Sequence, residues 1–196
     1  MPRITRDSLL TLEDYAKIRK QKRAEVMAHK KSRKIALGDH IMLIFEDDVT
    51  IRYQIQEMLR IERIFQEDEI VHELETYLPL VPDGTNWKAT MMIEYPDPVE
   101  RAERLAQMLG IEDRVWVKVD GFPSVYAIAD EDLDRENSEK TSSVHFLRFE
   151  LTQGMIRALK QQHQLSIGVD HPAYQITIDA VDEQSRASLI NDLISE

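Results

Sequence analysis

The chain has no cysteine among its 196 residues. This absence excludes disulfides, thiolate metal sites, cysteine-ligated iron–sulfur clusters and a cysteine nucleophile. Long hydrophobic runs are also missing, and the longest fall far short of the roughly 20 residues that a bilayer span needs. The opening residues, MPRITRDSLL, contain no apolar signal core after their charges. We therefore expect a cytoplasmic protein without a membrane span.

Glycine and proline are scarce, with six and seven residues, and the sequence shows no low-complexity tract or internal repeat. It also lacks a Walker loop and the motifs G-x-G-x-x-G, G-x-S-x-G and H-E-x-x-H. The usual nucleotide-binding and hydrolase functions thus have no support in the sequence. The apolar fraction of 42% is sufficient for a hydrophobic core in one domain, with or without an appendage.

The net charge of −11 is distributed very unevenly along the chain. Residues 1–40, the basic head, carry 11 Lys/Arg and 5 Asp/Glu, whereas the remaining 156 residues carry 14 and 31. An acidic body repels phosphates and argues against nucleic-acid binding. The basic head is either an arm for RNA or acidic lipid, or a solvated helix face beside an acidic surface. We favour the second interpretation and expect a homodimer.

Hydrophobic periodicity favours an α+β fold with a mainly antiparallel sheet and packed helices. Thr11 and Asp14 resemble a capping box at the start of a basic amphipathic helix, LEDYAKIRKQKRAEVMAHKK. Strand-like segments flank Gly38 and the turn at residues 120–123, as in hairpins, and no regular βαβ alternation follows. We expect a basic helical segment at residues 1–34 and a single α+β domain at residues 35–196.

The segment IRYQIQEMLRIERIF predicts a helix that places Glu62 within an apolar stripe. Glu62 lies near the middle of this stripe, between Leu59 and Phe65. A buried carboxylate without a partner costs several kcal/mol, so Glu62 is expected to be buried beside a cation, a proton or a metal.

Histidines and carboxylates supply a candidate metal site. Alternation along SSVHFLRFEL turns His145 inward with Leu147 and Phe149, and His171 ends the strand LSIGVD. Imidazole and carboxylate ligands suit iron, manganese or zinc. The alternative is that His145 is a hydrogen-bonded core residue and His171 a turn residue. The candidate ligands are His145, His171, Glu62, Glu57 and Glu94.

Two further groups of charged residues are candidates, one for an anion-binding site and the other for a calcium-binding loop. Arg148, Arg60 and Lys88 are candidates for binding an anion, but we favour structural ion pairs for them. Asp130, Asp132 and Asp134 have the spacing that begins a calcium loop. Arg135 stands where that loop needs glycine, and Thr141 replaces its final glutamate, so we expect a solvated loop.

Six segments together resemble an uncharacterised bacterial family of the domain-of-unknown-function type. The resemblance covers roughly residues 3 to 175. It rests on ITRDSLLTLEDYAKIR, IALGDHIMLIFED, RYQIQEMLRIERIF, LVPDGTNWKATMMIEYPD, VYAIADEDLDRENSEKTSSVHFLRFELT and GVDHPAY.

Members of that family are commonly encoded beside a rubrerythrin-like protein and an iron–sulfur oxidoreductase that resembles heterodisulfide reductase subunits. The resemblance therefore implies an accessory or partner protein of a redox or oxidative-stress module. It assigns no residue a catalytic role. The alternative from the residues is a metal-dependent enzyme or sensor with a His/carboxylate site, and whether the chain is an enzyme stays open.

Overall fold

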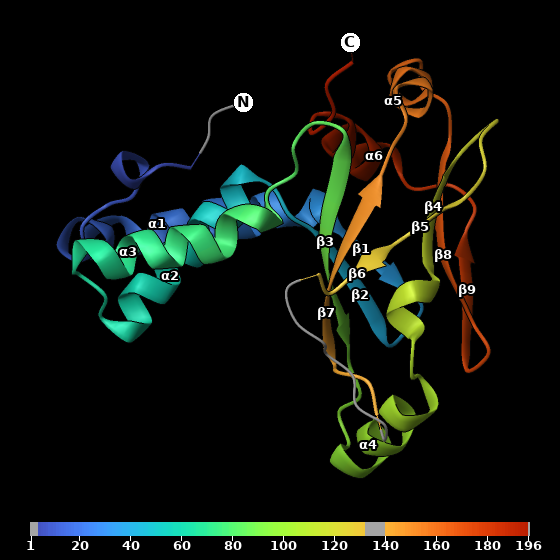
Figure 1. Ribbon diagram of the computed structural model, residues 1–196, viewed down its shortest axis with the longest axis horizontal. Helices are drawn as coiled ribbons and strands as arrows, with labels where there is room; N and C mark the ends of the chain where they lie inside the picture. The colour runs from blue at the N-terminus through green and yellow to red at the C-terminus, as the bar shows by residue number, and fades with distance from the viewer. Residues whose placement is uncertain (1–3, 132–139, 196) are drawn as a thin grey trace. The chain divides into compact units, whose positions relative to one another are not determined.

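The computed structural model describes residues 4–131 and 140–195 of the chain (Figure 1). These residues form helices and two antiparallel sheets, which confirms the predicted α+β class. Two compact units are present. The helical unit comprises the chain up to Ser32 together with Glu46–Pro82, and the sheet unit comprises Arg33–Phe45 together with the chain from Asp83 onward. Residues 46–82 thus group with the basic helix.

The helical unit contains three α-helices. Thr11 caps α1 by accepting from the Asp14 N–H, and Asp47 and Thr50 cap each other at the start of α2. The elements are η1 (Arg6–Ser8), α1 (Leu12–Lys30), α2 (Asp48–Glu62), α3 (Glu67–Tyr77) and η3 (Leu78–Leu80). Their hydrophobic core consists of Ile4, Leu9, Ile51, Ile55, Leu59, Ile70 and Leu74. Among the described residues, no helix is long and apolar enough to cross a membrane.

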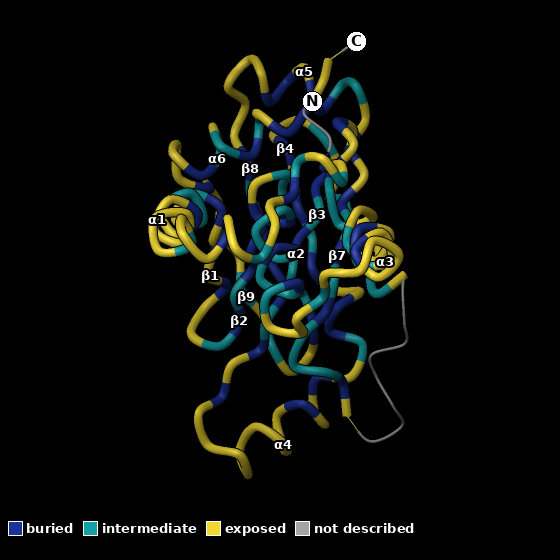
Figure 2. The backbone as a smooth tube through the Cα atoms, turned by 90° about the vertical axis from the view of Figure 1, so that its left-hand side faces the viewer, coloured by how far each residue is buried: buried dark blue, intermediate teal, exposed yellow. Residues whose placement is uncertain are grey.

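The basic helix α1 is attached to α2 largely through polar contacts. Only Tyr15 and Val26 of α1 are buried, and most of the helix is exposed (Figure 2). The Tyr15 hydroxyl donates to Glu57 at 2.6 Å, and His29 Nε2 lies 2.6 Å from an Asp47 oxygen. Because these two contacts lie near opposite ends of α1, they fix its direction along α2.

The prediction of a buried Glu62 is wrong. Glu62 is exposed, as are its neighbours Ile61 and Phe65. The helix ends there because Arg63 adopts a left-handed conformation, with φ of 56°. The buried face of α2 runs from Thr50 to Leu59, so the last turn extends past the packed part of the helix. The periodicity identified the face correctly but not where its packing stops.

The sheet unit contains two sheets, and neighbouring strands in both are antiparallel. The first has the order β1-β2-β3-β7-β6 and the second β5-β4-β8-β9. The first sheet comprises β1 (Lys34–Leu37), β2 (Ile41–Phe45), β3 (Asn86–Ile93), β6 (Ile128–Ala129) and β7 (Val144–Glu150). The second comprises β4 (Val115–Val119), β5 (Val125–Tyr126), β8 (Leu165–His171) and β9 (Tyr174–Ile178). The accompanying helical segments are η2 (Lys31–Arg33), α4 (Pro98–Gln107), η4 (Ile111–Arg114), α5 (Gln153–Lys160) and α6 (Glu183–Ile190).

Alternation along β7 places its inner residues in the core of the sheet unit. His145, Leu147 and Phe149 are buried, while the intervening residues are only half-buried. One hydrophobic cluster includes residues from both sheets, among them Trp87 and Phe45, whose rings meet edge to face. The inward orientation predicted for His145 is therefore correct.

A buried ion pair ties the start of the sheet unit to its C-terminal segment. Arg33, which belongs to the basic head in sequence, is only 1% exposed. Its guanidinium donates to the Phe45 carbonyl at 2.8 Å and to Asp192 at 2.5 and 3.2 Å. The charge pattern alone placed Arg33 on a solvated face, because sequence does not show this long-range contact.

We predict that Asp192→Ala lowers the free energy of unfolding by about 3–5 kcal/mol, since it removes the carboxylate that binds the buried Arg33 guanidinium through two hydrogen bonds. Urea unfolding followed by circular dichroism measures this change. Lys17→Ala, which removes an exposed ion pair with Asp14, is the control and should change stability little. Equal stability of Asp192→Ala and the wild type would contradict the prediction.

Candidate metal centre

Three side chains from separate elements of the sheet unit converge on one buried position. Glu112 lies in η4, Asp130 follows β6, and His145 is the second residue of β7. Asp130 is fixed beside β7, because its N–H donates to the Phe146 carbonyl and its Oδ1 accepts from the Phe146 N–H, both at 2.8 Å. Its φ of 46° is left-handed, a conformation that aspartate tolerates better than most residues.

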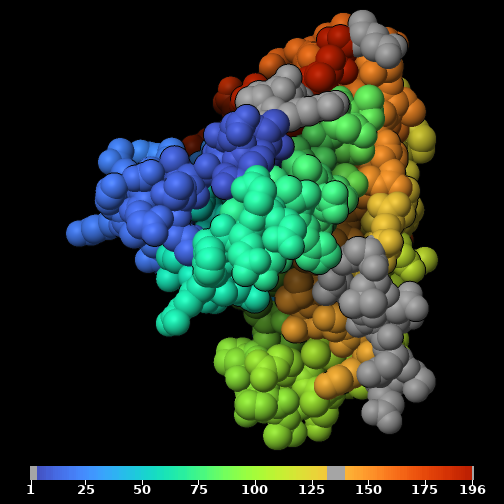
Figure 3. Space-filling model, turned by 60° about the vertical axis from the view of Figure 1, so that its left-hand side comes forward, coloured from blue at the N-terminus to red at the C-terminus, as the bar shows by residue number. Residues whose placement is uncertain are grey.

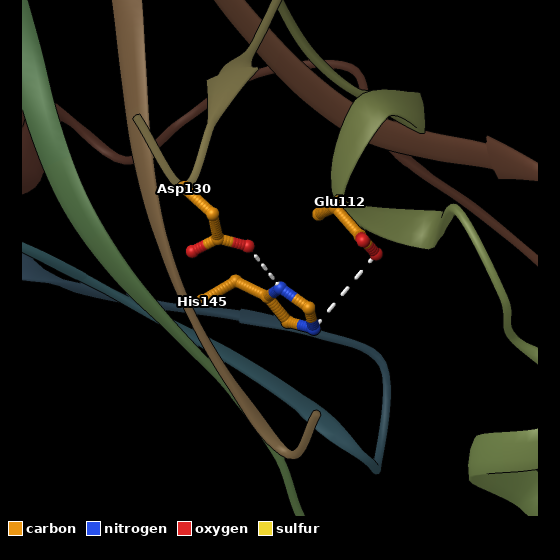
Figure 4. Close-up of side chains that lie close together, drawn as sticks. All are labelled: Glu112, Asp130 and His145. Carbon is orange, nitrogen blue, oxygen red and sulfur yellow. Dashed lines mark hydrogen bonds and ion pairs between the residues drawn. The ribbon is translucent and has the colours of Figure 1, made fainter. Parts of the chain in front are cut away.

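The imidazole of His145 lies between the two carboxylates (Figure 4). Its Nδ1 is 2.5 Å from Asp130 Oδ2, and its Nε2 is 3.8 Å from Glu112 Oε2. Two further oxygens surround Nε2: the Thr141 Oγ1 at 2.9 Å and the Ser142 carbonyl at 3.0 Å. The Thr141 hydroxyl also lies 3.2 Å from Glu112 Oε2. The ring therefore has oxygen atoms at both nitrogens.

Burial makes the charges of this cluster strongly interdependent. The side chains of His145, Asp130 and Glu112 are 0%, 8% and 7% exposed. Two carboxylates in such a position require compensating positive charge. The Ser142 carbonyl oxygen, which can only accept a hydrogen bond, lies 3.0 Å from Nε2. An imidazolium and a bound cation are two sources of such positive charge at this position.

The donor set fits a divalent metal ion. Ligand atoms of Glu112, Asp130 and His145 lie within 4.8 Å of one another, and no other such trio occurs in the described residues. A carboxylate on one ring nitrogen, with the other nitrogen directed at the ion, is the usual arrangement of a metal-binding histidine. With bonds of about 2.0–2.2 Å, an ion fits between Nε2 and Glu112 Oε2.

The predicted ligands other than His145 lie outside this cluster. Both ring nitrogens of His171 contact backbone: Nε2 lies 3.0 Å from the Leu109 carbonyl, and Nδ1 accepts from the Ala173 N–H. Glu94 is exposed just after β3. Glu57 and Glu62 belong to the helical unit, where Arg19, Arg60 and Tyr15 bind the Glu57 carboxylate.

Glu112 and Asp130 were missed as partners of His145. Asp130 was assigned to a solvated loop, but its side chain is buried, so that interpretation is wrong for this residue. Asp132 and Asp134 lie outside the described residues. Glu112 lies in η4, which is too short for hydrophobic periodicity to indicate which side chains are buried. Its role depends on contacts with residues more than 25 positions away in sequence, at Thr141 and His145.

The candidate anion ligands are divided between the units. In the sheet unit, Lys88 is the cross-strand neighbour of Arg148, which forms ion pairs with Glu131 and Glu150. Burial, followed by the Arg148 charge, lowers the pKa of Lys88. Arg60 lies in the helical unit and pairs with Glu57 at 3.1 Å. Arg148 and Arg60 thus take part in structural ion pairs.

Comparison with known proteins shows the family of the chain. Residues 3–193 match the family described as "Protein of unknown function (DUF3501)", and the chain belongs to that family. A crystal structure of a novel protein of unknown function from Burkholderia pseudomallei K96243 is 57% identical in sequence. That match covers 98% of this chain and 100% of the other, with a TM-score of 0.94. No curated protein matches the chain.

Glu57 lies outside the metal cluster, in the helical unit. We predict that its ionised carboxylate stabilises that unit. Hydrogen bonds from Arg19 lower its pKa from 4.5 to about 2, against the opposing effect of burial. The resulting stability is present above pH 4.5 and is lost as the pH falls toward 2. Glu57→Gln should lower the free energy of unfolding by about 2 kcal/mol at neutral pH, allowing for solvent screening.

Unfolding free energies of Glu57→Gln and wild type at pH 7 and pH 3 measure this effect. The difference between the two proteins should shrink at the lower pH. Glu75→Gln, an exposed change on α3, is the control. A pH-independent difference would contradict the role of the Glu57 charge.

Proposed function

We propose that the chain binds one divalent metal ion, iron, manganese or zinc, and acts as a metal-dependent sensor or enzyme in redox metabolism. His145 Nε2 and a Glu112 oxygen would be its ligands, and Asp130 would orient the ring. One observation carries the proposal: a fully buried imidazole is held between two buried carboxylates.

The energetics favour a binding role over a purely structural one. Replacement of a buried ion pair or triad by well-packed apolar side chains is often neutral or stabilising. A buried carboxylate–histidine–carboxylate arrangement is therefore a weak way to stabilise a core. The same three groups are effective when they receive a cation, because their charge and their bond directions are already set.

The oxygen atoms around Nε2 favour some metal ions over others at this site. The Thr141 hydroxyl and the Ser142 carbonyl lie 2.9 and 3.0 Å from Nε2, close enough to complete a mixed nitrogen and oxygen environment. Such ligands suit iron(II) or manganese and also accommodate zinc, whereas copper(I) prefers sulfur ligands that a chain without cysteine supplies only through methionine.

Burial also bears on what the ion would do. The bound metal would supply Lewis-acid or one-electron redox chemistry. His145 is 0% exposed and Thr141 is 1% exposed. Such enclosure suits sensing, or electron exchange with a small reactant, better than the turnover of a bulky substrate. The protein side chains would hold the ion, fix the imidazole and exclude water.

A second role follows from the exposed helix α1, which would dock the chain onto a redox partner as an accessory protein. Lys17, Lys20 and Arg23 are exposed on this helix and offer a positive surface to an acidic protein. The family resemblance points to rubrerythrin-like or iron–sulfur oxidoreductase proteins as that partner. Metal binding and docking are compatible functions of one chain.

We predict stoichiometric metal binding by untagged protein after removal of metal and addition of iron(II), manganese or zinc in turn. Elemental analysis of the desalted protein measures it. His145→Ala and Glu112→Gln should lose the ion, whereas Asp130→Asn should lower affinity roughly 10–100-fold. His163→Ala changes an exposed histidine and is the matched control.

Circular dichroism establishes that each variant is folded, and Glu112→Gln keeps the shape of the side chain if His145→Ala does not fold. A folded wild type that retains none of the three metals would refute the proposal. Equal metal content in wild type and Glu112→Gln would also refute it.

The docking role predicts that a purified rubrerythrin-like partner binds wild type and loses affinity when Lys20 and Arg23 are both changed to Glu. The loss should be largest at low salt, because screening weakens contacts between exposed charges. Surface plasmon resonance at two salt concentrations measures it. Exchange of Lys118, an exposed lysine of β4, for Glu is the control. Unchanged binding by the α1 variant would contradict docking through this helix.

A further inference from the structure

An apolar groove runs between α1 and α2 in the helical unit. Residues at helical spacing face each other across it, with Tyr15, Ile18, Lys22 and Val26 on α1 and Val49, Arg52, Tyr53 and Gln56 on α2. The groove has a volume of about 340 Å³. The contacts of α1 with Glu57 and Asp47 join the two helices at positions roughly 20 Å apart along α1.

Three apolar residues that line this groove are partly exposed to water: Leu10, Ile18 and Val49 are 38%, 38% and 42% exposed. Tyr15 and Val26, which also line it, are buried. The helix that forms one wall carries six Lys/Arg and three Asp/Glu. The groove is therefore a partly exposed apolar surface beside a helix of net positive charge, the pattern expected where another protein surface binds.

A second exposed apolar surface lies on the same unit, at the corner between α2 and α3. Ile61, Phe65 and Val71 are 58%, 73% and 40% exposed. Phe65 is the most exposed large hydrophobic residue in the described part of the chain. The adjoining helix α3 carries five Asp/Glu and no Lys/Arg. This corner therefore has an aromatic residue at its tip and an anionic border.

We propose that the groove is filled by a second copy of this chain. The corner with Phe65 of one copy would enter the groove of the other, and the reverse contact would form at the same time. Such reciprocal contacts give a closed twofold dimer. The surfaces of α1, in blue, and of the α2–α3 region, in cyan, are shown in Figure 3.

Charge and shape both favour a second copy as the occupant. The basic helix α1 and the acidic helix α3 attract each other between two copies, whereas contact of α1 with α1 would place like charges together. A phenylalanine entering an apolar groove is the kind of anchor that dominates interface energies. The dimer would bury both of the exposed apolar surfaces of the helical unit.

Sedimentation of the full-length protein over a hundredfold range of concentration tests the dimer. Wild type should be dimeric. Phe65→Ser alters the corner and Val49→Glu alters the groove, and each should weaken dimerisation about tenfold to a hundredfold. Val99→Ser is the matched control, because Val99 is equally prominent at 68% exposed but lies on α4. It should dimerise like wild type.

An equimolar mixture of Phe65→Ser and Val49→Glu distinguishes this interface from other modes of association. One unaltered corner and one unaltered groove then meet, so the mixture should dimerise more strongly than either variant alone. A wild type that is monomeric throughout would overturn the proposal. So would folded Phe65→Ser or Val49→Glu variants that dimerise as well as wild type, or a mixture no stronger than its components.

Discussion

The need to neutralise buried negative charge is the constraint on which the sheet unit depends. Glu112 and Asp130 come from separate elements, and both meet the imidazole that β7 carries into the core. Burial removes the water that would otherwise screen the carboxylates, so their positions relative to His145 must be set by the fold. Two hydrogen bonds fix Asp130 beside Phe146, one from its backbone N–H and one to its side-chain Oδ1. The Thr141 hydroxyl donates to Glu112 on the other side of the ring.

The two units use buried and exposed charge in different ways. In the sheet unit, the Arg33–Asp192 pair and the His145 cluster lie inside, where the loss of a charged partner is costly. In the helical unit, Arg19, Tyr15 and Glu57 form a partly exposed network that attaches α1 without deep hydrophobic packing. This attachment leaves an apolar groove beside a helix rich in lysine and arginine, which is why the helical unit presents a surface for association.

Much of the fold was predictable from local signals. Thr11 caps α1 as its sequence context indicates, Gly38 lies in the turn between β1 and β2, and alternation in β7 turned His145 inward. The site was only partly predictable, because Glu112 reaches His145 through tertiary packing across 33 positions of sequence. Helical periodicity also led to the wrong prediction that Glu62 is buried. Periodicity identifies the apolar face of a helix, but it does not show where neighbouring elements stop covering that face.

The central claim is that His145 and Glu112 hold an ion that Asp130 helps to orient. Anomalous diffraction from crystals loaded with manganese or iron(II) tests this most directly. The account predicts a peak between His145 Nε2 and the Glu112 carboxylate, at about 2.0–2.2 Å from each ligand atom, with Asp130 still bound to Nδ1. A loaded crystal with no peak there, and with Nε2 still donating to the Ser142 carbonyl, would contradict it.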